Sequence, residues 1–165
     1  MNKSSVGKIG EDLSEQYLKN NGYKIIERNF WKPWGELDII AKDPKGILVF
    51  IEVKTMRQFG NAAINPEDNL TSAKLKKLQR TAGLYAGFNE DLITDVGWRI
   101  DLVAVSLNPD VSRETLESIV SRETKSALRK SFLSRFLHLI LFKNDEKDVL
   151  TNMEKYCDIK HFENL

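Results

Sequence analysis

Residues 35–54 have the sequence GELDIIAKDPKGILVFIEVK, in which two β-rich runs flank a turn. The runs are Leu37–Lys42 and Ile47–Lys54. Residues 43–46, Asp-Pro-Lys-Gly, suit a turn because proline presets φ and glycine tolerates positive φ. We therefore predict a β-hairpin. From position 47 to 53 its second strand is apolar on both faces apart from Glu52, which is typical of a buried central strand.

Three charged side chains lie in this hairpin, Asp38 in the first strand and Glu52 and Lys54 in the second. Glu52 and Lys54 project from one face because they are two positions apart. A two-residue loop would place Asp38 opposite Ile51, on the wrong face. A three-residue loop or a single bulge places Asp38 opposite Glu52 and brings the three groups together. A site at this position therefore requires the longer loop.

The flanking sequence predicts further helices and strands. Apolar residues at helical spacing predict helices over residues 5–21 and 71–86. Strands are expected over residues 23–30 and 96–107, and residues 58–69 have the composition of a loop. The order helix, strand, hairpin, helix, strand is typical of an α/β fold with a mixed central sheet and flanking helices.

Residues 111–165 are predicted to form a C-terminal extension that is mostly helical and ends in a poorly ordered acidic tail. Glu123–Phe142 has an apolar stripe and a basic face, whereas Thr115–Val120 is a weaker strand candidate. An amphipathic helix must bury its stripe, so packing on the domain or on a second copy is one interpretation. Contact with a protein partner, a lipid surface or the DNA backbone is the other.

Composition sets limits on the class of protein. The 25 Lys and Arg residues are offset by 24 Asp and Glu, which argues against coating nucleic acid through charge alone but allows a local basic surface. The single cysteine, Cys157, excludes an internal disulfide and fits a reducing compartment. Neither a signal peptide nor an apolar run of about 20 residues is found, so we expect a cytoplasmic protein without an integral membrane segment.

The paired carboxylates suggest a metal site. Two carboxylates side by side on a buried sheet repel each other unless a cation lies between them. Mg²⁺ prefers oxygen ligands, keeps several waters and is commonly held by one or two carboxylates. Near a phosphodiester, such an ion can acidify an attacking water while Lys54 orients the water or stabilises the transition state. We expect Mg²⁺, for which Mn²⁺ can substitute.

These residues resemble the PD-(D/E)XK nuclease superfamily, and more closely the YraN-type family of small bacterial endonuclease-like proteins, which look related to archaeal Holliday junction resolvases. The resemblance implies a restriction-endonuclease-like three-layer fold, with residues 1–110 as the nuclease-like domain and 111–165 as a C-terminal helical extension. It rests on an ordered set of motifs: Gly10-Glu11, Gly22-Tyr23, Arg28-Asn29-Phe30, Gly35-Glu36-Leu37-Asp38, Phe50-Ile51-Glu52-Val53-Lys54-Thr55, Leu70-Thr71 with Lys74, and Arg99-Ile100-Asp101.

The resemblance also implies roles for residues of the hairpin and the first helix. Asp38, Glu52 and the carbonyl of Val53 would be metal ligands, and Lys54 would be the catalytic lysine. Glu11 would face the same site and hold a metal-bound water. On its pattern alone, Glu11 also fits a solvated helix residue.

Four further residues are candidates for nucleic-acid contact. Lys74 would approach a phosphate at a helix N-terminus, although a lysine-rich run is often only a solvated face. Arg57 lies three positions after Lys54, whereas family members often carry an arginine directly after the threonine. Trp34 and its neighbour Trp31 could stack on unpaired bases, although burial at a sheet edge is the commoner fate of such residues.

The implied function is a metal-dependent endonuclease that hydrolyses DNA phosphodiester bonds, with branched or flapped structures as candidate substrates. The branched DNA cut by resolvases is near-symmetric and would suit a homodimer. Two alternatives stay open. One is a non-catalytic nucleic-acid-binding module that retains the nuclease fold. The other is a partner-binding protein that uses the C-terminal helix. Arg99 and Asp101 share a strand face, so they fit a structural ion pair as well as a role in the site.

Overall fold

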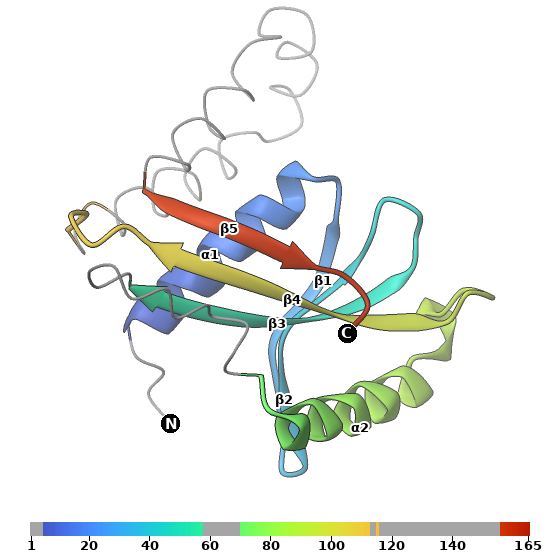
Figure 1. Ribbon diagram of the computed structural model, residues 1–165. Helices are drawn as coiled ribbons and strands as arrows, with labels where there is room; N and C mark the ends of the chain where they lie inside the picture. The colour runs from blue at the N-terminus through green and yellow to red at the C-terminus, as the bar shows by residue number, and fades with distance from the viewer. Residues whose placement is uncertain (1–4, 58–69, 113–114, 116–155) are drawn as a thin grey trace, which may run out of the picture.

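The computed structural model describes residues 5–57, 70–112, 115 and 156–165 (Figure 1). These residues form one five-stranded sheet, in the order β1-β2-β3-β4-β5, and two α-helices. Neither described helix is long and apolar enough to cross a membrane. The elements in chain order are α1 (Ser5–Asn20), β1 (Lys24–Lys32), β2 (Gly35–Lys42), β3 (Leu48–Arg57), α2 (Ser72–Phe88), the short 3-10 helix η2 (Glu90–Leu92), β4 (Trp98–Leu107) and β5 (Cys157–Phe162).

Helices α1 and α2 cover opposite faces of the sheet (Figure 1). Side chains alternate along β3, so Ile51 packs in one core cluster with Leu13 of α1, whereas Phe50 packs in the other with Ala82 of α2. Burial of a side chain the size of Phe50 contributes roughly 1.5–3 kcal/mol to folding. The predicted three-layer α/β fold is confirmed.

The sheet is mixed, as predicted. Strand β2 runs antiparallel to both β1 and β3, β4 runs parallel to β3, and β5 runs antiparallel to β4. A parallel pair needs a crossover connection, which here contains α2. The N-terminus of α2 therefore lies at the end of the sheet where β3 finishes.

The hairpin between β2 and β3 has the longer of the two predicted loops. Asp43 and Ile47 close it, with the Asp43 N–H donating to the Ile47 carbonyl at 3.0 Å, and Gly46 inside it has a φ of 84°. The strand pairing that follows places Ile39 opposite Ile51. In this register Asp38 is the next residue along and lies beside Glu52, as the site requires.

The structure corrects the prediction for the end of the tail. Residues 157–162 form β5, an edge strand whose Cys157 pairs with Leu107 and packs in the core on the α1 side. The polar side chains that hid this strand in the sequence, such as Asp158 and Lys160, are typical of sheet edges, where they discourage pairing with another chain. The predicted elements Thr115–Val120 and Glu123–Phe142 lie outside the described residues, apart from Thr115 itself.

Candidate functional site

A polar pocket of about 250 Å³ opens where β2 begins and β3 ends. Residues from both helices and both strands meet there, and we call it the β2–β3 pocket. Of the residues that the sequence predicts for the site, all but Arg57 and Trp34 line it. Its lining residues are Val6, Gly7, Glu11, Glu36, Asp38, Glu52, Val53, Lys54, Thr55 and Lys74.

The two carboxylates of the hairpin are buried on neighbouring strands. Asp38 is 8% exposed, and Glu52 is 3% exposed. The Val53 N–H donates to Asp38 Oδ2 at 2.9 Å, which fixes the orientation of that carboxylate. Because the N–H and C=O of one strand residue point to the same side, the Val53 carbonyl is also directed toward Asp38. The three residues of the predicted ligand set, Asp38, Glu52 and Val53, all line this one pocket.

Two lysines neutralise Glu52. Lys54 Nζ lies 2.7 Å from Glu52 Oε1, and Lys74 Nζ lies 2.5 Å from the same oxygen. Burial alone would lower the pKa of Lys74, but its hydrogen bond to the Glu52 carboxylate raises the pKa above its ordinary value of 10.5, so Lys74 is charged. Lys74 lies in the first turn of α2, and its N–H donates to the N-cap side chain of Thr71.

Glu11 is buried, so the interpretation as a solvated helix residue is wrong. It is 5% exposed, and Oε2 lies 3.9 Å from Arg28 Nη2. A close approach of α1 to the sheet places it there. A Cβ on Gly10 would lie 1.7 Å from Thr55 Oγ1, so only glycine allows this distance between α1 and β3. Glycine before Glu11 is thus part of what positions that carboxylate.

The structure places Arg57 and Trp34 outside the β2–β3 pocket. The Arg57 side chain lies beside Val111, with Nη2 3.5 Å from the Val111 carbonyl oxygen. Trp34 lies in the turn between β1 and β2 and lines a separate apolar groove. Sequence reasoning did not assign Glu36 to the site, although it lines the pocket. Its signal was the spacing of two from Asp38, which places both on one strand face.

Comparison with known proteins identifies the family of the chain. The model of the uncharacterised protein family UPF0102 matches residues 10–105. The chain belongs to UPF0102, the YraN-type family. A UPF0102 protein of Clostridium botulinum (strain Loch Maree / Type A3) is 42% identical over 103 residues, covering 62% of this chain and 80% of the relative. A UPF0102 protein of Trichlorobacter lovleyi is 36% identical over 115 residues, covering 70% of this chain and 87% of the relative.

The UPF0102 match spans α2 and the central strands but ends before β5. Glu11, Asp38, Glu52, Lys54 and Lys74 all fall inside the matched range. All residues that line the pocket therefore lie in the part of the chain that matches the family, except Val6 and Gly7.

The donor set of this UPF0102 chain fits a small hard cation. Within the described residues, no group of three or more His, Cys, Asp or Glu side chains is placed to hold a metal ion. An ion here would therefore take one oxygen each from Asp38 and Glu52, the Val53 carbonyl, and water. Mg²⁺ is usually held in this way, with few protein ligands and several waters.

A second group of charges lies on the α1 face of the sheet, and we call it the Arg99 cluster: Asp43, Arg99, Asp101 and His161. Arg99 Nη1 lies 2.6 Å from Asp43 Oδ2, Arg99 Nε lies 3.0 Å from Asp101 Oδ1, and His161 Nε2 lies 2.9 Å from Asp101 Oδ2. Burial would raise the pKa of Asp101, but hydrogen bonds with His161 and Arg99 lower it below its ordinary value of 3.8. Arg99 and Asp101 therefore form a structural ion pair, and neither residue lines the β2–β3 pocket.

Proposed function

We propose that this member of UPF0102 is a metal-dependent endonuclease that hydrolyses DNA phosphodiester bonds. The observation that carries the proposal is the cross-strand pair of Asp38 and Glu52, with Lys54 beside it, in an open polar pocket. Buried carboxylates are rare and costly unless they are paired or hold a cation. Carboxylates that also face an opening are therefore candidates for a site of function.

Asp38, Glu52 and the Val53 carbonyl would hold Mg²⁺ or Mn²⁺. When bound, such an ion lowers the pKa of a coordinated water and neutralises charge on a phosphate. Lys54 carries a fixed positive charge beside Glu52, where it would stabilise the charge that develops on the phosphate oxygens. Glu11 would accept a hydrogen bond from a water in the pocket and so orient it for attack.

Lys74 would contact the phosphate. Its side chain is 38% exposed, compared with 20% for Lys54, so it has more freedom to leave Glu52 when an anion enters. It also lies in the first turn of α2, where the helix dipole favours negative charge. We expect Lys74 to exchange Glu52 for a phosphate oxygen when substrate binds.

The same ion pairs favour a second function. Because Lys54 and Lys74 already pair with Glu52, the charge of this one carboxylate is balanced without a cation. A non-catalytic module that retains the fold and binds nucleic acid would need no more than this. A homodimer suited to branched DNA and a partner bound through Glu123–Phe142 stay predictions, and the latter segment lies outside the described residues.

A cleavage assay with a matched pair of variants separates the two functions. Wild type, Glu52→Gln and Glu90→Gln would be incubated with duplex, single-stranded, flapped and four-way-junction DNA, with Mg²⁺, Mn²⁺ or EDTA. Glu90 is exposed on η2, so Glu90→Gln controls for loss of one carboxylate elsewhere. We expect metal-dependent cleavage by wild type and Glu90→Gln, and none by Glu52→Gln.

Two other results would contradict the endonuclease. Equal cleavage by wild type and Glu52→Gln would identify a contaminating nuclease. No cleavage by any variant, together with a salt-dependent affinity for DNA that Glu52→Gln leaves intact, would establish the binding module instead.

A further inference from the structure

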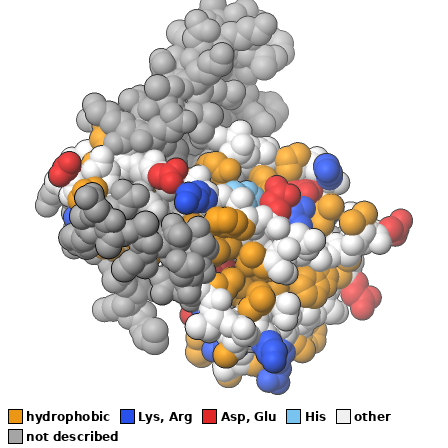
Figure 2. Space-filling model, viewed as in Figure 1, with side chains coloured by type: hydrophobic (Ala, Val, Ile, Leu, Met, Phe, Trp, Pro, Cys, Tyr) orange, Lys and Arg blue, Asp and Glu red, His pale blue; other side chains and the backbone are white. Residues whose placement is uncertain are grey.

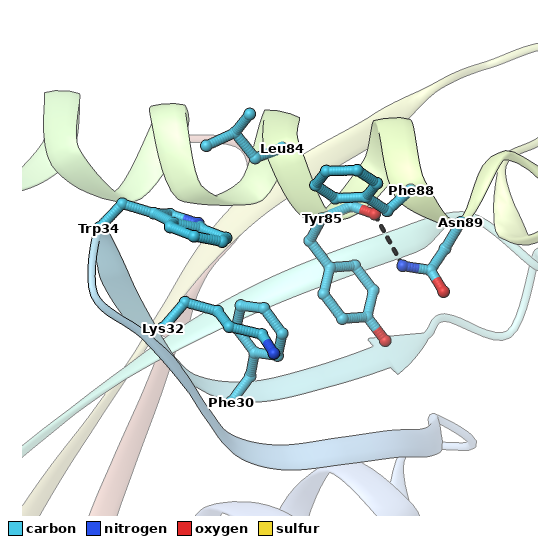
Figure 3. Close-up of a pocket in the computed structure, with 7 residues that line it drawn as sticks. All are labelled: Phe30, Lys32, Trp34, Leu84, Tyr85, Phe88 and Asn89. Atoms are coloured by element: carbon cyan, nitrogen blue, oxygen red, sulfur yellow. Dashed lines mark hydrogen bonds between the residues drawn. The ribbon is translucent and has the colours of Figure 1, made fainter.

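A groove of about 360 Å³ lies between the β1–β2 turn and the C-terminal half of α2 (Figure 3). Phe30 and Lys32 come from β1, Trp34 from the turn, and Leu84 and Phe88 from α2. We call it the aromatic groove. Trp34 is 39% exposed and Phe88 is 76% exposed. The burial that is common for a tryptophan at a sheet edge is therefore not observed.

The base of the aromatic groove is held by side-chain contacts, whereas its walls are exposed. Tyr85 donates from its hydroxyl to Glu27 Oε2 at 3.1 Å, and its ring packs edge-on against Phe30 with ring centroids 5.0 Å apart. Lys32 Nζ lies 5.8 Å from the centre of the Phe30 ring. A flat ligand could thus be held between fixed and exposed aromatic surfaces, with a cation at its edge.

Helix α2 connects the aromatic groove to the β2–β3 pocket. Lys74 lines the pocket, and Leu84, ten residues later, lines the groove, which corresponds to about 15 Å along the helix axis. Lys77 and Phe88 follow Lys74 at intervals of 3 and 14 residues, so they lie on the same side of the helix. Lys77 is exposed and lies between the two sites.

The β1–β2 turn also connects the aromatic groove to the β2–β3 pocket. Trp34 lines the groove, and Glu36, two residues later, lines the pocket. Between them, Gly35 packs directly on α2, because a Cβ there would lie 2.0 Å from Thr81 Oγ1. The pocket and the groove are therefore two ends of one seam between the turn and α2.

Charge and shape together indicate what fits this seam. Lys74, Lys77 and Lys32 provide positive charge in the pocket, midway and at the groove, which complements a chain of phosphates. Figure 2 shows Lys and Arg side chains at the lower edge of the molecule, where Figure 1 places α2 and the β1–β2 turn. The faces of paired bases are covered by their neighbours, so only an unpaired base can stack in the groove.

We propose that the aromatic groove binds an unpaired base of the strand that the β2–β3 pocket cleaves, so that the substrate carries a single-stranded segment beside the cut. The inference rests on the proposed function, because it assigns a substrate class to the same site. An apolar peptide is the competing occupant of the groove.

The test measures binding without cleavage. Affinities for a labelled duplex, and for the same duplex with a single-stranded tail of about eight nucleotides, would be measured in EDTA by fluorescence anisotropy. The variants are Trp34→Ala, Phe88→Ala and the matched control Trp31→Ala, whose tryptophan is 68% exposed and lies outside the groove. We expect Trp34→Ala and Phe88→Ala to weaken binding of the tailed duplex about tenfold, as loss of one base stack does, and duplex binding less than twofold.

Several results would overturn the inference. Equal losses for tailed and plain duplex, equal losses in Trp31→Ala, or no loss in Phe88→Ala would each exclude a base in the groove. Binding of an apolar peptide that Trp34→Ala abolishes, with DNA affinity unchanged, would assign the groove to a peptide. Phe88 is too exposed for its truncation to unfold the chain, so the test does not depend on Trp34→Ala being stable. Failure of cleavage with base binding intact would instead refute only the proposed endonuclease.

Discussion

The β2–β3 pocket and the Arg99 cluster both bury charged side chains, but they differ in how these charges are satisfied. Asp101 is fully buried, and its two oxygens accept hydrogen bonds from Arg99, His161 and the Asn164 N–H. Glu52 is almost as deeply buried, yet both of its lysine contacts fall on Oε1 and it faces an opening. Burial alone therefore does not separate the structural carboxylate from the one that we propose holds a metal ion. The direction and number of its partners do.

The largest expected effect is on cleavage by Glu52→Gln. The variant keeps the size of the side chain but removes the charge, so we expect cleavage to fall about a thousandfold or more. Its stability should change by less than about 1 kcal/mol, because Lys54 and Lys74 are partly exposed and can turn to solvent. Urea unfolding alongside the cleavage assay checks both values. A large loss of stability would show that the pocket is structural, like the Arg99 cluster.

The mirror-image change is Asp101→Asn, which should cost about 3–5 kcal/mol of unfolding free energy. It removes a buried negative charge and leaves Arg99, whose side chain is 13% exposed, with less compensation. Cleavage per folded molecule should stay within about twofold of wild type, because Asp101 does not line the β2–β3 pocket. Thermal unfolding measures the first effect and cleavage at low temperature the second. Loss of cleavage in a fully folded sample would place Asp101 in the site after all.

Much of this contrast could be predicted from residues 35–54 alone. Side chains on a strand alternate with a period of two, so only a few hairpin loops place Asp38 beside Glu52, and the observed loop is one of them. For Asp101 the sequence left a structural ion pair with Arg99 and a role in the site equally open. It could not decide between them because His161 reaches Asp101 from β5, a short polar edge strand far away in the sequence. The exposure of Trp34 likewise depends on where α2 packs, which no local pattern specifies.

Gly10→Ala tests how closely α1 must approach the pocket. A Cβ there would clash with Thr55 Oγ1, so α1 must shift, and we expect a loss of roughly 1–3 kcal/mol with a partial loss of cleavage as Glu11 moves away. Gly87→Ala is the matched control. Its Cβ would meet nothing within 4 Å, and alanine is the better helix former, so it should stabilise α2 by about 0.5–1 kcal/mol. Equal effects of the two changes on the free energy of unfolding would mean that the contact between Gly10 and Thr55 does not determine how closely α1 packs on the sheet.

The smallest expected effect is a loss of stability at acid pH that originates in the Arg99 cluster. Burial opposes ionisation of Asp43 and Asp101, but hydrogen bonds hold the pKa of both carboxyls below the ordinary value of 3.8. The bonds to Asp43 come from Arg99 and the backbone of Ile47 and Lys45, and the bonds to Asp101 come chiefly from His161 and Arg99. A carboxyl with a lowered pKa in the folded state contributes its full stability above the unfolded pKa and loses it as the pH falls through the folded value. Wild type should therefore lose stability progressively below about pH 4, and Asp101→Asn should show a shallower slope over the same range. Urea midpoints from pH 2 to 6 measure both slopes. Equal slopes of stability against pH would mean that Asp101 does not contribute to the acid response. The Arg99 cluster would then stabilise the sheet through hydrogen bonds that do not depend on the charge of Asp101.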